Sequence, residues 1–352
     1  MASNSELLVR LRAALAASDH RWRDAVLEPL PDKGLAHHHV RLAGTGALAR
    51  LPKQSQLGLD AAANLAYQRA CFERASVSGF TPRYLGFLPA SVNLPRGALL
   101  VEEISGRSAR LPDDLPRIAQ ALASLHTLAL PPAAARAPLL DAADPLAALA
   151  DEISVQAAHA SAASLDSAVA LALSRERARL QQLCSAPARP ARRLIAFDAH
   201  PGNFIMDADG KAVLVDLEKC RYSYPALDLA HATLYTSTTW DVDTRASLTV
   251  PELLDFYAVW SAAAGPLGEG AQAWHVPLRR AMWLWSISWC VKWRAVSGRP
   301  ATQSADGEDW AGEKSDAALL AHVRERVVHY LSPAVVSQVL EEFDALERAL
   351  RP

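Results

Sequence analysis

The sequence predicts an α+β fold, with a small antiparallel sheet first and a mainly helical remainder. Apolar and alternating segments typical of strands lie at residues 24–30, 37–42, 47–51, 83–88 and 98–101. Alanine-rich and amphipathic segments typical of helices predominate after residue 104. With 352 residues, the chain is long enough to form two lobes with a sizeable core.

Composition excludes several classes of partner. The formal net charge is −2, so nothing indicates binding to nucleic acid or to an acidic membrane surface. No apolar run reaches the length of a membrane span. The four cysteines lack the spacing of a metal site, and charged residues interrupt the first apolar run, so free thiols and a cytoplasmic location are expected. The oligomeric state is not indicated.

The most informative segment is residues 197–219, which reads FDAHPGNFIMDADGKAVLVDLEK. Asp198 and Asn203 are separated by four residues, the spacing of the Asp-x-x-x-x-Asn loop used in phosphoryl transfer. Residues 207–210 predict a hairpin turn between two apolar segments. Asp216 follows the second of these segments, which places a carboxylate at the end of a strand.

These residue types suit the chemistry of phosphoryl transfer, which depends mainly on positioning and charge neutralisation. Asp198 is the candidate to orient an attacking hydroxyl and accept its proton. Magnesium prefers oxygen ligands and usually keeps several waters, so Asn203 and Asp216 are sufficient as candidate ligands. The alternative is an ordinary β-hairpin with polar ends. The ordered sequence of loop, hairpin and strand-end carboxylate favours phosphoryl transfer.

Residues 198–203 (Asp-Ala-His-Pro-Gly-Asn) and 215–218 (Val-Asp-Leu-Glu) resemble the signature of the aminoglycoside phosphotransferase and choline kinase superfamily. These are small-molecule kinases with a protein-kinase-like fold. The resemblance implies a nucleotide-binding N-lobe at residues 1–103, a largely helical C-lobe at residues 104–352, and ATP and magnesium in the cleft. It also implies that Asp198 is the catalytic base and that Asn203 and Asp216 are metal ligands.

The resemblance further implies a cation on the third strand for the nucleotide phosphates. Arg50 and Lys53 are the candidates, and Arg50 is favoured because it lies within the apolar strand. The expected glutamate partner on the helix at residues 61–78 is missing, since Gln68 occupies the matching position. A glutamine could still orient Arg50 by hydrogen bonding. The loop at residues 31–36, which would cover the phosphates, contains a single glycine.

The resemblance also bears on the hinge and on two helices of the C-lobe. The hinge would place backbone groups around Glu102 and Ile104 at the adenine edge. On the helix at residues 115–128, His126 is expected to be a packed structural residue. Asp228 would open the next helix and brace the catalytic loop.

Substrate selection is expected from aromatic and acidic residues near the C-terminus. Trp240 and Asp241 form one candidate pair. A helix from Arg279 to Ala295 carries tryptophans four residues apart, among them Trp285 and Trp289, and resembles the Trp-rich segment of choline and ethanolamine kinases. Indole rings attract ammonium groups by about 0.5–2 kcal/mol each. The alternative is that most of these rings belong to the core.

The sequence therefore predicts an ATP- and magnesium-dependent kinase for a small-molecule hydroxyl, with an amino alcohol such as a choline-like compound preferred over an aminoglycoside. A kinase for a sugar or an acyl-CoA-linked hydroxyl is a third option. A nucleotide-binding pseudokinase or regulatory module is the alternative of a different class, because the helix glutamate is missing and the glycine loop is sparse.

Overall fold

The computed structural model describes residues 4–18, 20–31, 34–302 and 304–351. Its contacts divide the chain into two compact units. The first comprises Met1–Val77, Thr81–Ile104 and Val296–Val323, and the second comprises Ser78–Phe80, Ser105–Ala295 and Arg324–Pro352. The sequence placed a single boundary between residues 103 and 104, whereas in the structure Val296–Val323 joins the first unit.

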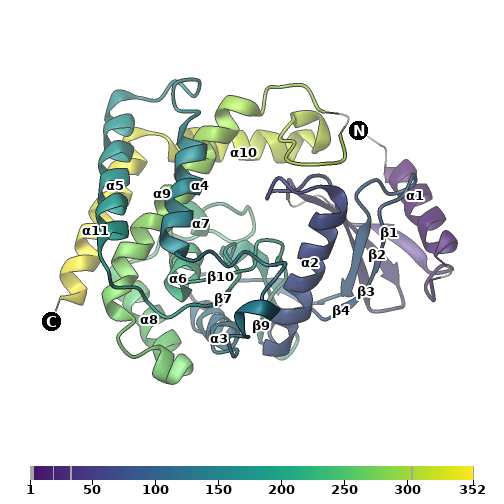
Figure 1. Cartoon of the computed structure of the whole chain (residues 1–352), viewed down its shortest axis with the longest axis horizontal. Coiled ribbons are helices and arrows are strands. Elements are labelled where there is room, and N and C mark those ends of the chain that lie inside the picture. Colours follow the sequence, from purple (N-terminus) through teal and green to yellow (C-terminus); the bar gives the residue numbers. More distant parts are fainter. Residues whose placement is uncertain (1–3, 19, 32–33, 303, 352) are drawn as a thin grey trace. The chain divides into compact units, whose positions relative to one another are not determined.

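The first unit contains a five-stranded antiparallel sheet with the order β1-β2-β3-β5-β4 (Figure 1). Its strands are β1 (Val26–Pro29), β2 (His37–Ala43), β3 (Ala47–Pro52), β4 (Tyr84–Leu88) and β5 (Ala98–Glu102). The predicted strands are confirmed, with ends shifted by one or two residues. The turn between β2 and β3 needs glycine, because Gly44 and Gly46 have φ values of +74° and +67°.

The two faces of this sheet contact different helices, because successive strand residues point to opposite sides. Buried residues of one face, such as Leu42, Ala49 and Leu100, form a cluster with Leu11 and Leu15 of α1 (Asn4–Ala17). Residues of the alternate set contact α2 (Ala61–Ala75), as the pairs His37–Gln68 and Arg50–Phe72 show. The period-2 pattern therefore directs Arg50 toward α2.

The segment 296–323 reaches the first unit through backbone and side-chain hydrogen bonds. Ser55 donates to the carbonyl of Gly307 at 3.0 Å, and Gly307 donates to the carbonyl of Leu59 at 2.9 Å. The backbone N–H of Asp309 donates to Gln54 Oε1 at 2.8 Å. These contacts fix the chain between β3 and α2.

The second unit is built around helices and short strand pairs. Helix α3 (Leu115–His126) packs on α6 (Pro225–Thr233) and α8 (Val250–Ala264). The other helices are α4 (Pro145–Ala157), α5 (Ser167–Ser185), α7 (Tyr235–Thr238), α9 (Gln272–Val296) and α11 (Pro333–Leu350), while α10 (Ala317–Tyr330) contributes its later residues. The helix expected at residues 279–295 thus begins seven residues earlier, at Gln272, with Pro277 inside it.

Two small sheets position the loops of this unit. β7 (Arg193–Ile195) pairs with β10 (Arg221–Ser223), and the sheet β6-β8-β9 joins Arg107–Ser108, Phe204–Met206 and Ala212–Leu214. Within the ranges that the structure describes, no helix is both long and apolar enough to cross a bilayer.

Candidate active site

The loop between β7 and β8 closes on itself through Asn203. The Asn203 amide nitrogen Nδ2 donates to the carbonyl oxygen of Asp198 at 2.8 Å, and its backbone N–H donates to the carbonyl of His200 at 2.9 Å. A short 3₁₀ turn, Pro201–Asn203, makes this reversal possible. Because the amide donor is used inside the loop, the group that Asn203 presents outward is its acceptor oxygen Oδ1.

The hairpin that follows brings Asp216 back beside this loop. Phe204 pairs with Leu214, and the backbone N–H of Val215 donates to the carbonyl of Asn203 at 2.9 Å. Asp207 Oδ1 stabilises the turn by accepting from the N–H groups of Asp209 and Lys211. Asp216 therefore stands one residue beyond a bond to Asn203, close enough for its charge to act on Asp198.

Phe197, directly before Asp198, has an unusual backbone conformation. Its φ of +61° lies in the left-handed region that residues other than glycine rarely adopt. The Asp228 carboxylate holds this conformation by accepting from the N–H of Ala196 and of Phe197, each at 2.7 Å. The predicted brace of the catalytic loop by Asp228 is thus present.

A buried network fixes Asp228 in turn. His126 Nε2 lies 3.1 Å from Asp228 Oδ2, and the Trp260 indole N–H donates to His126 Nδ1 at 3.1 Å. Since Nδ1 accepts, the ring proton is on Nε2, which donates to the carboxylate. His126 is fully buried and is structural, as the sequence predicts.

Asp198 forms an ion pair that the sequence did not reveal. Lys219 Nζ donates to Asp198 Oδ2 at 2.8 Å, with 9% and 13% of the two side chains exposed. Burial alone would raise the pKa of Asp198, but Lys219, with smaller contributions from His200 and His231, outweighs this effect, and the pKa lies below its usual range. Burial would likewise lower the pKa of Lys219, yet Asp198 and Glu218 hold it above its usual range. Both groups are therefore charged.

A histidine faces the other oxygen of the same carboxylate. His231 Nδ1 lies 3.7 Å from Asp198 Oδ1, which is beyond hydrogen-bond distance. Burial lowers the pKa of His231 to about 4, although the charge of Asp198 opposes this shift. Near neutral pH the imidazole is therefore uncharged, and Lys219 is the charged partner of Asp198.

Trp285 packs against the loop that carries Asp198. Its ring makes edge contacts with Phe197, at 4.9 Å between centroids, and with His231, at 6.4 Å. Lys219 Nζ lies 5.5 Å from the ring centroid, and the indole N–H donates to Glu152 Oε2 at 3.1 Å. Trp285 is buried, as the alternative of core tryptophans predicts, and so are Trp283 and Trp293.

Trp240 and Asp241 lie beside the catalytic loop. An added Cβ at Gly202 would stand 2.6 Å from Asp241 Oδ2, so the carboxylate rests against the loop backbone. The Trp240 ring lies 5.7 Å from the ring of Trp289 and stacks on that of Tyr330 at 6.3 Å. Trp240 and Trp289 are half-buried. The two candidate substrate segments therefore meet.

In the first unit, the candidate phosphate-binding residues occupy two different settings. Arg50 is 3% exposed, and its guanidinium carbon lies 5.3 Å from the Phe72 ring centroid. Lys53 Nζ donates to the carbonyl of Gly34 at 3.2 Å. It therefore contacts the loop expected to cover the phosphates, although residues 32 and 33 of that loop lie outside the described part of the chain.

Gln68 contacts His37 of β2. Its Oε1 lies 3.1 Å from His37 Nε2.

At the end of the sheet, the Glu102 carboxylate accepts from the backbone and side chain of Arg83 at 3.1 and 3.0 Å. Ile104 follows and is half-buried. The Glu102 side chain is thus engaged within the sheet, and its backbone N–H also donates to the carbonyl of Arg83 at 2.9 Å.

A comparison with protein-family models matches residues 33–265 to the phosphotransferase enzyme family. This range covers more than half of the chain and includes Asp198, Asn203 and Asp216. The chain belongs to the phosphotransferase enzyme family. Membership confirms the predicted class of enzyme, a phosphotransferase with an alcohol group as acceptor. A search of curated protein sequences found no match.

Solved structures share the fold of this phosphotransferase at low identity. A choline/ethanolamine kinase family protein from Mesorhizobium loti is 18% identical with a TM-score of 0.59, over 96% of this chain and 99% of that one. A Plasmodium vivax ethanolamine kinase is 14% identical with a TM-score of 0.63, over 96% and 94%. The GDP complex of aminoglycoside 2′-phosphotransferase-IIIa is 18% identical with a TM-score of 0.54, over 86% and 93%. The kinase-like fold is confirmed.

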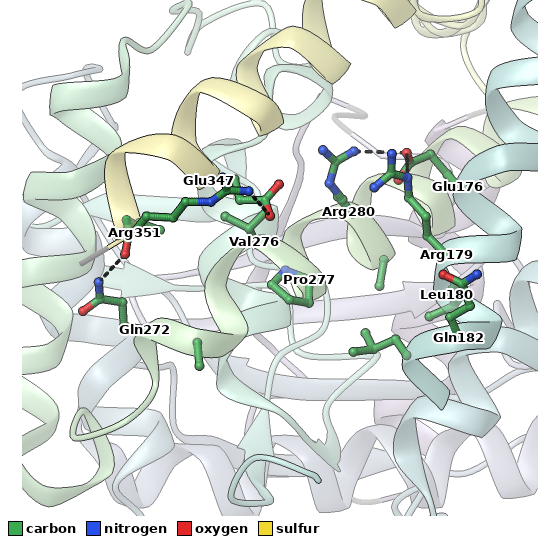
Figure 2. A pocket seen from close by; sticks show the side chains of 14 residues that line it. Glu176, Arg179, Leu180, Gln182, Gln272, Val276, Pro277, Arg280, Glu347 and Arg351 are labelled. Carbon is green, nitrogen blue, oxygen red and sulfur yellow. Dashed lines mark hydrogen bonds and ion pairs between the residues drawn. The ribbon is translucent and has the colours of Figure 1, made fainter. Parts of the chain in front are cut away.

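The phosphotransferase also has a cavity elsewhere in the second unit. It has a volume of about 480 Å³ and lies between α5, α9 and α11 (Figure 2). Ion pairs line it, including Arg280 with Glu176 at 3.0 Å and Arg351 with Glu347 at 3.3 Å. Its lining includes none of the candidate site residues. Among the residues described, no group of three or more His, Cys, Asp or Glu side chains is arranged to hold a metal.

Proposed function

We propose that this phosphotransferase transfers the γ-phosphoryl group of ATP, in the presence of magnesium, to the hydroxyl of a small amino alcohol. The observation that carries the proposal is the closed loop in which Asn203 Nδ2 donates to the Asp198 carbonyl at 2.8 Å. This contact gives the Asp-x-x-x-x-Asn spacing a defined geometry, with a carboxylate and an amide oxygen presented by one short segment.

Asp198 is the proposed catalytic base. It orients the acceptor hydroxyl and takes its proton while the hydroxyl oxygen forms a bond to the γ-phosphorus. The bond from that phosphorus to the bridging oxygen breaks, and ADP leaves. The pKa of Asp198 lies below its usual range, so the carboxylate is ionised and can accept a proton near neutral pH.

The side chains of Asn203 and Asp216 are suited to binding a magnesium ion. Asn203 directs its amide donor inward, and Asp216 is held beside it by the Val215–Asn203 hydrogen bond. One amide oxygen and one carboxylate are hard oxygen donors of the kind this ion prefers. When bound, the ion would neutralise charge on the transferring phosphates. Arg50 or Lys53 of the first unit would bind those phosphates, and backbone groups at Glu102 and Ile104 would bind adenine.

The acceptor class is proposed from Trp240, Trp289 and Asp241. Two half-buried indoles in edge contact, with a carboxylate that touches Gly202 of the catalytic loop, suit an ammonium group carried near a hydroxyl. An aminoglycoside carries several amines and would need more acidic groups than this pair provides. Fold relatives include proteins named for each substrate class, so the acceptor must be measured.

The test is steady-state nucleotide turnover with a panel of acceptors. Choline, ethanolamine, an aminoglycoside and a simple sugar are each supplied with ATP or GTP, with magnesium or with a chelator. We expect turnover with an amino alcohol, ATP and magnesium, and none when the metal is chelated. Turnover with the aminoglycoside or sugar alone would overturn the acceptor proposal. Nucleotide binding without turnover on any acceptor would overturn the enzyme proposal in favour of a regulatory module.

A further inference from the structure

The two oxygens of the Asp198 carboxylate have different surroundings. Oδ2 accepts from Lys219 Nζ at 2.8 Å, whereas Oδ1 faces His231 Nδ1 at 3.7 Å without a hydrogen bond between them. Thirteen per cent of the Asp198 side chain remains exposed. One oxygen is therefore held by protein, and the other has room for an additional donor.

Lys219 is itself held in place from several sides. It lies in the turn after β9, which the Cys220 N–H closes by donating to the Leu217 carbonyl at 3.0 Å. Its ammonium lies over the ring of Trp285, and that ring is fixed by the 3.1 Å hydrogen bond to Glu152. The donor that reaches Asp198 thus has little freedom of its own.

A buried ion pair of this kind contributes little net stability. Desolvation of two charges offsets much of their attraction, and apolar replacement of both partners is often neutral or stabilising. Stability alone is therefore a weak reason for a buried lysine on the proposed base. Geometry offers a stronger one, because misplacing a reacting group by about 1 Å can cost 100-fold in rate.

We infer that Lys219 is a positioning residue, which holds Oδ2 of Asp198 and so leaves Oδ1 as the oxygen that receives the acceptor hydroxyl. This inference rests on the proposed function. The hydroxyl donates to Oδ1, and its proton passes to that oxygen as the bond to phosphorus forms. Lys219 contacts neither the hydroxyl nor the phosphoryl group in this role and acts through Asp198.

The test compares Lys219→Met and Lys219→Arg with the wild-type enzyme, using the acceptor found in the panel. Lys219→Met is expected to lower kcat by about 10- to 100-fold, with KM for ATP changed by less than about threefold, because only the base is displaced. Lys219→Arg keeps a charged donor and should recover part of the lost kcat. Lys211→Met is the matched control, since Lys211 lies on the hairpin and donates to the Gly79 carbonyl.

A double variant separates this role from others and also guards against misfolding. Lys219→Met leaves Asp198 buried without its cation, which destabilises the fold, whereas Lys219→Met combined with Asp198→Asn removes both charges of the pair. If Lys219 acts through Asp198, the double variant has the same kcat as Asp198→Asn alone. If the two substitutions lower kcat by factors that multiply in the double variant, Lys219 acts independently of Asp198, and the inference is overturned.

The outcomes for the inference and for the function are distinct. Full kcat in Lys219→Met, with an active wild-type enzyme, overturns only the role of Lys219. A rise in KM for ATP with unchanged kcat also overturns it, because it would place Lys219 in nucleotide binding. Absence of turnover in the wild-type enzyme overturns the proposed function itself.

Discussion

Gly202 and Asp241 approach each other more closely than a side chain at residue 202 would allow. A Cβ there would lie 2.6 Å from Asp241 Oδ2 and 3.0 Å from its Cβ. Gly202 has no unusual φ, so the requirement for glycine comes from this contact and not from the backbone conformation. Asp241, which lies 39 residues further along the chain, thus requires glycine at residue 202 of the loop.

We therefore predict that Gly202→Ala lowers the free energy of unfolding by about 1–3 kcal/mol, because Asp241 must move. Chemical denaturation measures this change. Gly298→Ala is the matched control, since nothing lies within 4 Å of a Cβ at that residue. Adding Asp241→Ala to Gly202→Ala should remove most of the cost, and an equal cost with and without Asp241 would refute the contact.

The residues of the site differ in how far sequence could identify them. Asp198, Asn203 and Asp216 lie within 19 consecutive residues, so their spacing alone indicates the chemistry. Lys219 is only three residues past Asp216, but its pairing with Asp198 depends on the hairpin fold and on Trp285, which is 66 residues further on. A lysine directly after a strand-end Asp-Leu-Glu was the available signal.

Helix α6 holds the conformation of the candidate catalytic loop. Asp228 in its first turn accepts hydrogen bonds from two backbone groups and from His126, and it is fully buried. The left-handed backbone of Phe197 depends on these acceptors. Trp260 of α8 extends the network to a third helix, so α3, α6 and α8 together hold one turn of the loop.

Asp228→Asn is expected to destabilise this arrangement strongly. An amide has one acceptor oxygen, so at least one donor among Ala196, Phe197 and His126 loses its partner, at about 1–3 kcal/mol for each buried group. The free energy of unfolding measures the loss. Asp255→Asn, at an exposed residue of α8, is the control and should have no measurable effect. An equally small effect at Asp228 would contradict the proposed brace.

The sequence predicted the elements whose own residues show a regular apolar pattern, such as the strands β2 and β3 and the helix α3. The short strands β7 and β10 were not predicted, because each has three residues and they pair across 25 intervening positions. Helix α9 begins before Pro277, a residue that removes a backbone donor and disfavours a helix interior. Packing of its apolar residues overrides that local preference.

At the scale of the whole molecule, the chain order does not match the compact units. Residues 296–323 return to the first unit, where Asp309 accepts from Thr302 at 2.9 Å and pairs with Lys314 at 2.5 Å. Periodicity could not have indicated this, because the segment has little regular structure and is held by loop hydrogen bonds. The single boundary predicted between residues 103 and 104 therefore missed that the first unit is discontinuous in the sequence.

Buried neutral histidines predict how the stability of the molecule depends on pH. His275 stacks on Tyr257 at 4.0 Å, and burial with the nearby charge of Arg279 lowers its pKa to about 4. Between that value and the usual 6.5, the unfolded chain binds a proton that the folded chain does not. The free energy of unfolding should therefore fall as pH decreases through this window, by up to about 1.4 kcal/mol per pH unit for one such group.

His275→Phe keeps an aromatic ring for stacking and removes the titrating group. We expect a smaller slope of the unfolding free energy between pH 6.5 and 4 in this variant than in the wild-type protein, by denaturant titration at several pH values. His159→Phe, at a half-buried residue of the same unit, serves as control. An unchanged slope in His275→Phe would show that His275 is protonated in the folded protein.

Asp198 is the proposed base of the phosphoryl transfer, and the kcat of Asp198→Asn measures this role. With the best acceptor, ATP and magnesium, we predict a kcat at least about 100-fold below that of the wild-type enzyme, with KM for ATP nearly unchanged. Circular dichroism establishes that the variant is folded. A folded Asp198→Asn enzyme with wild-type kcat would contradict the role of Asp198 as the base.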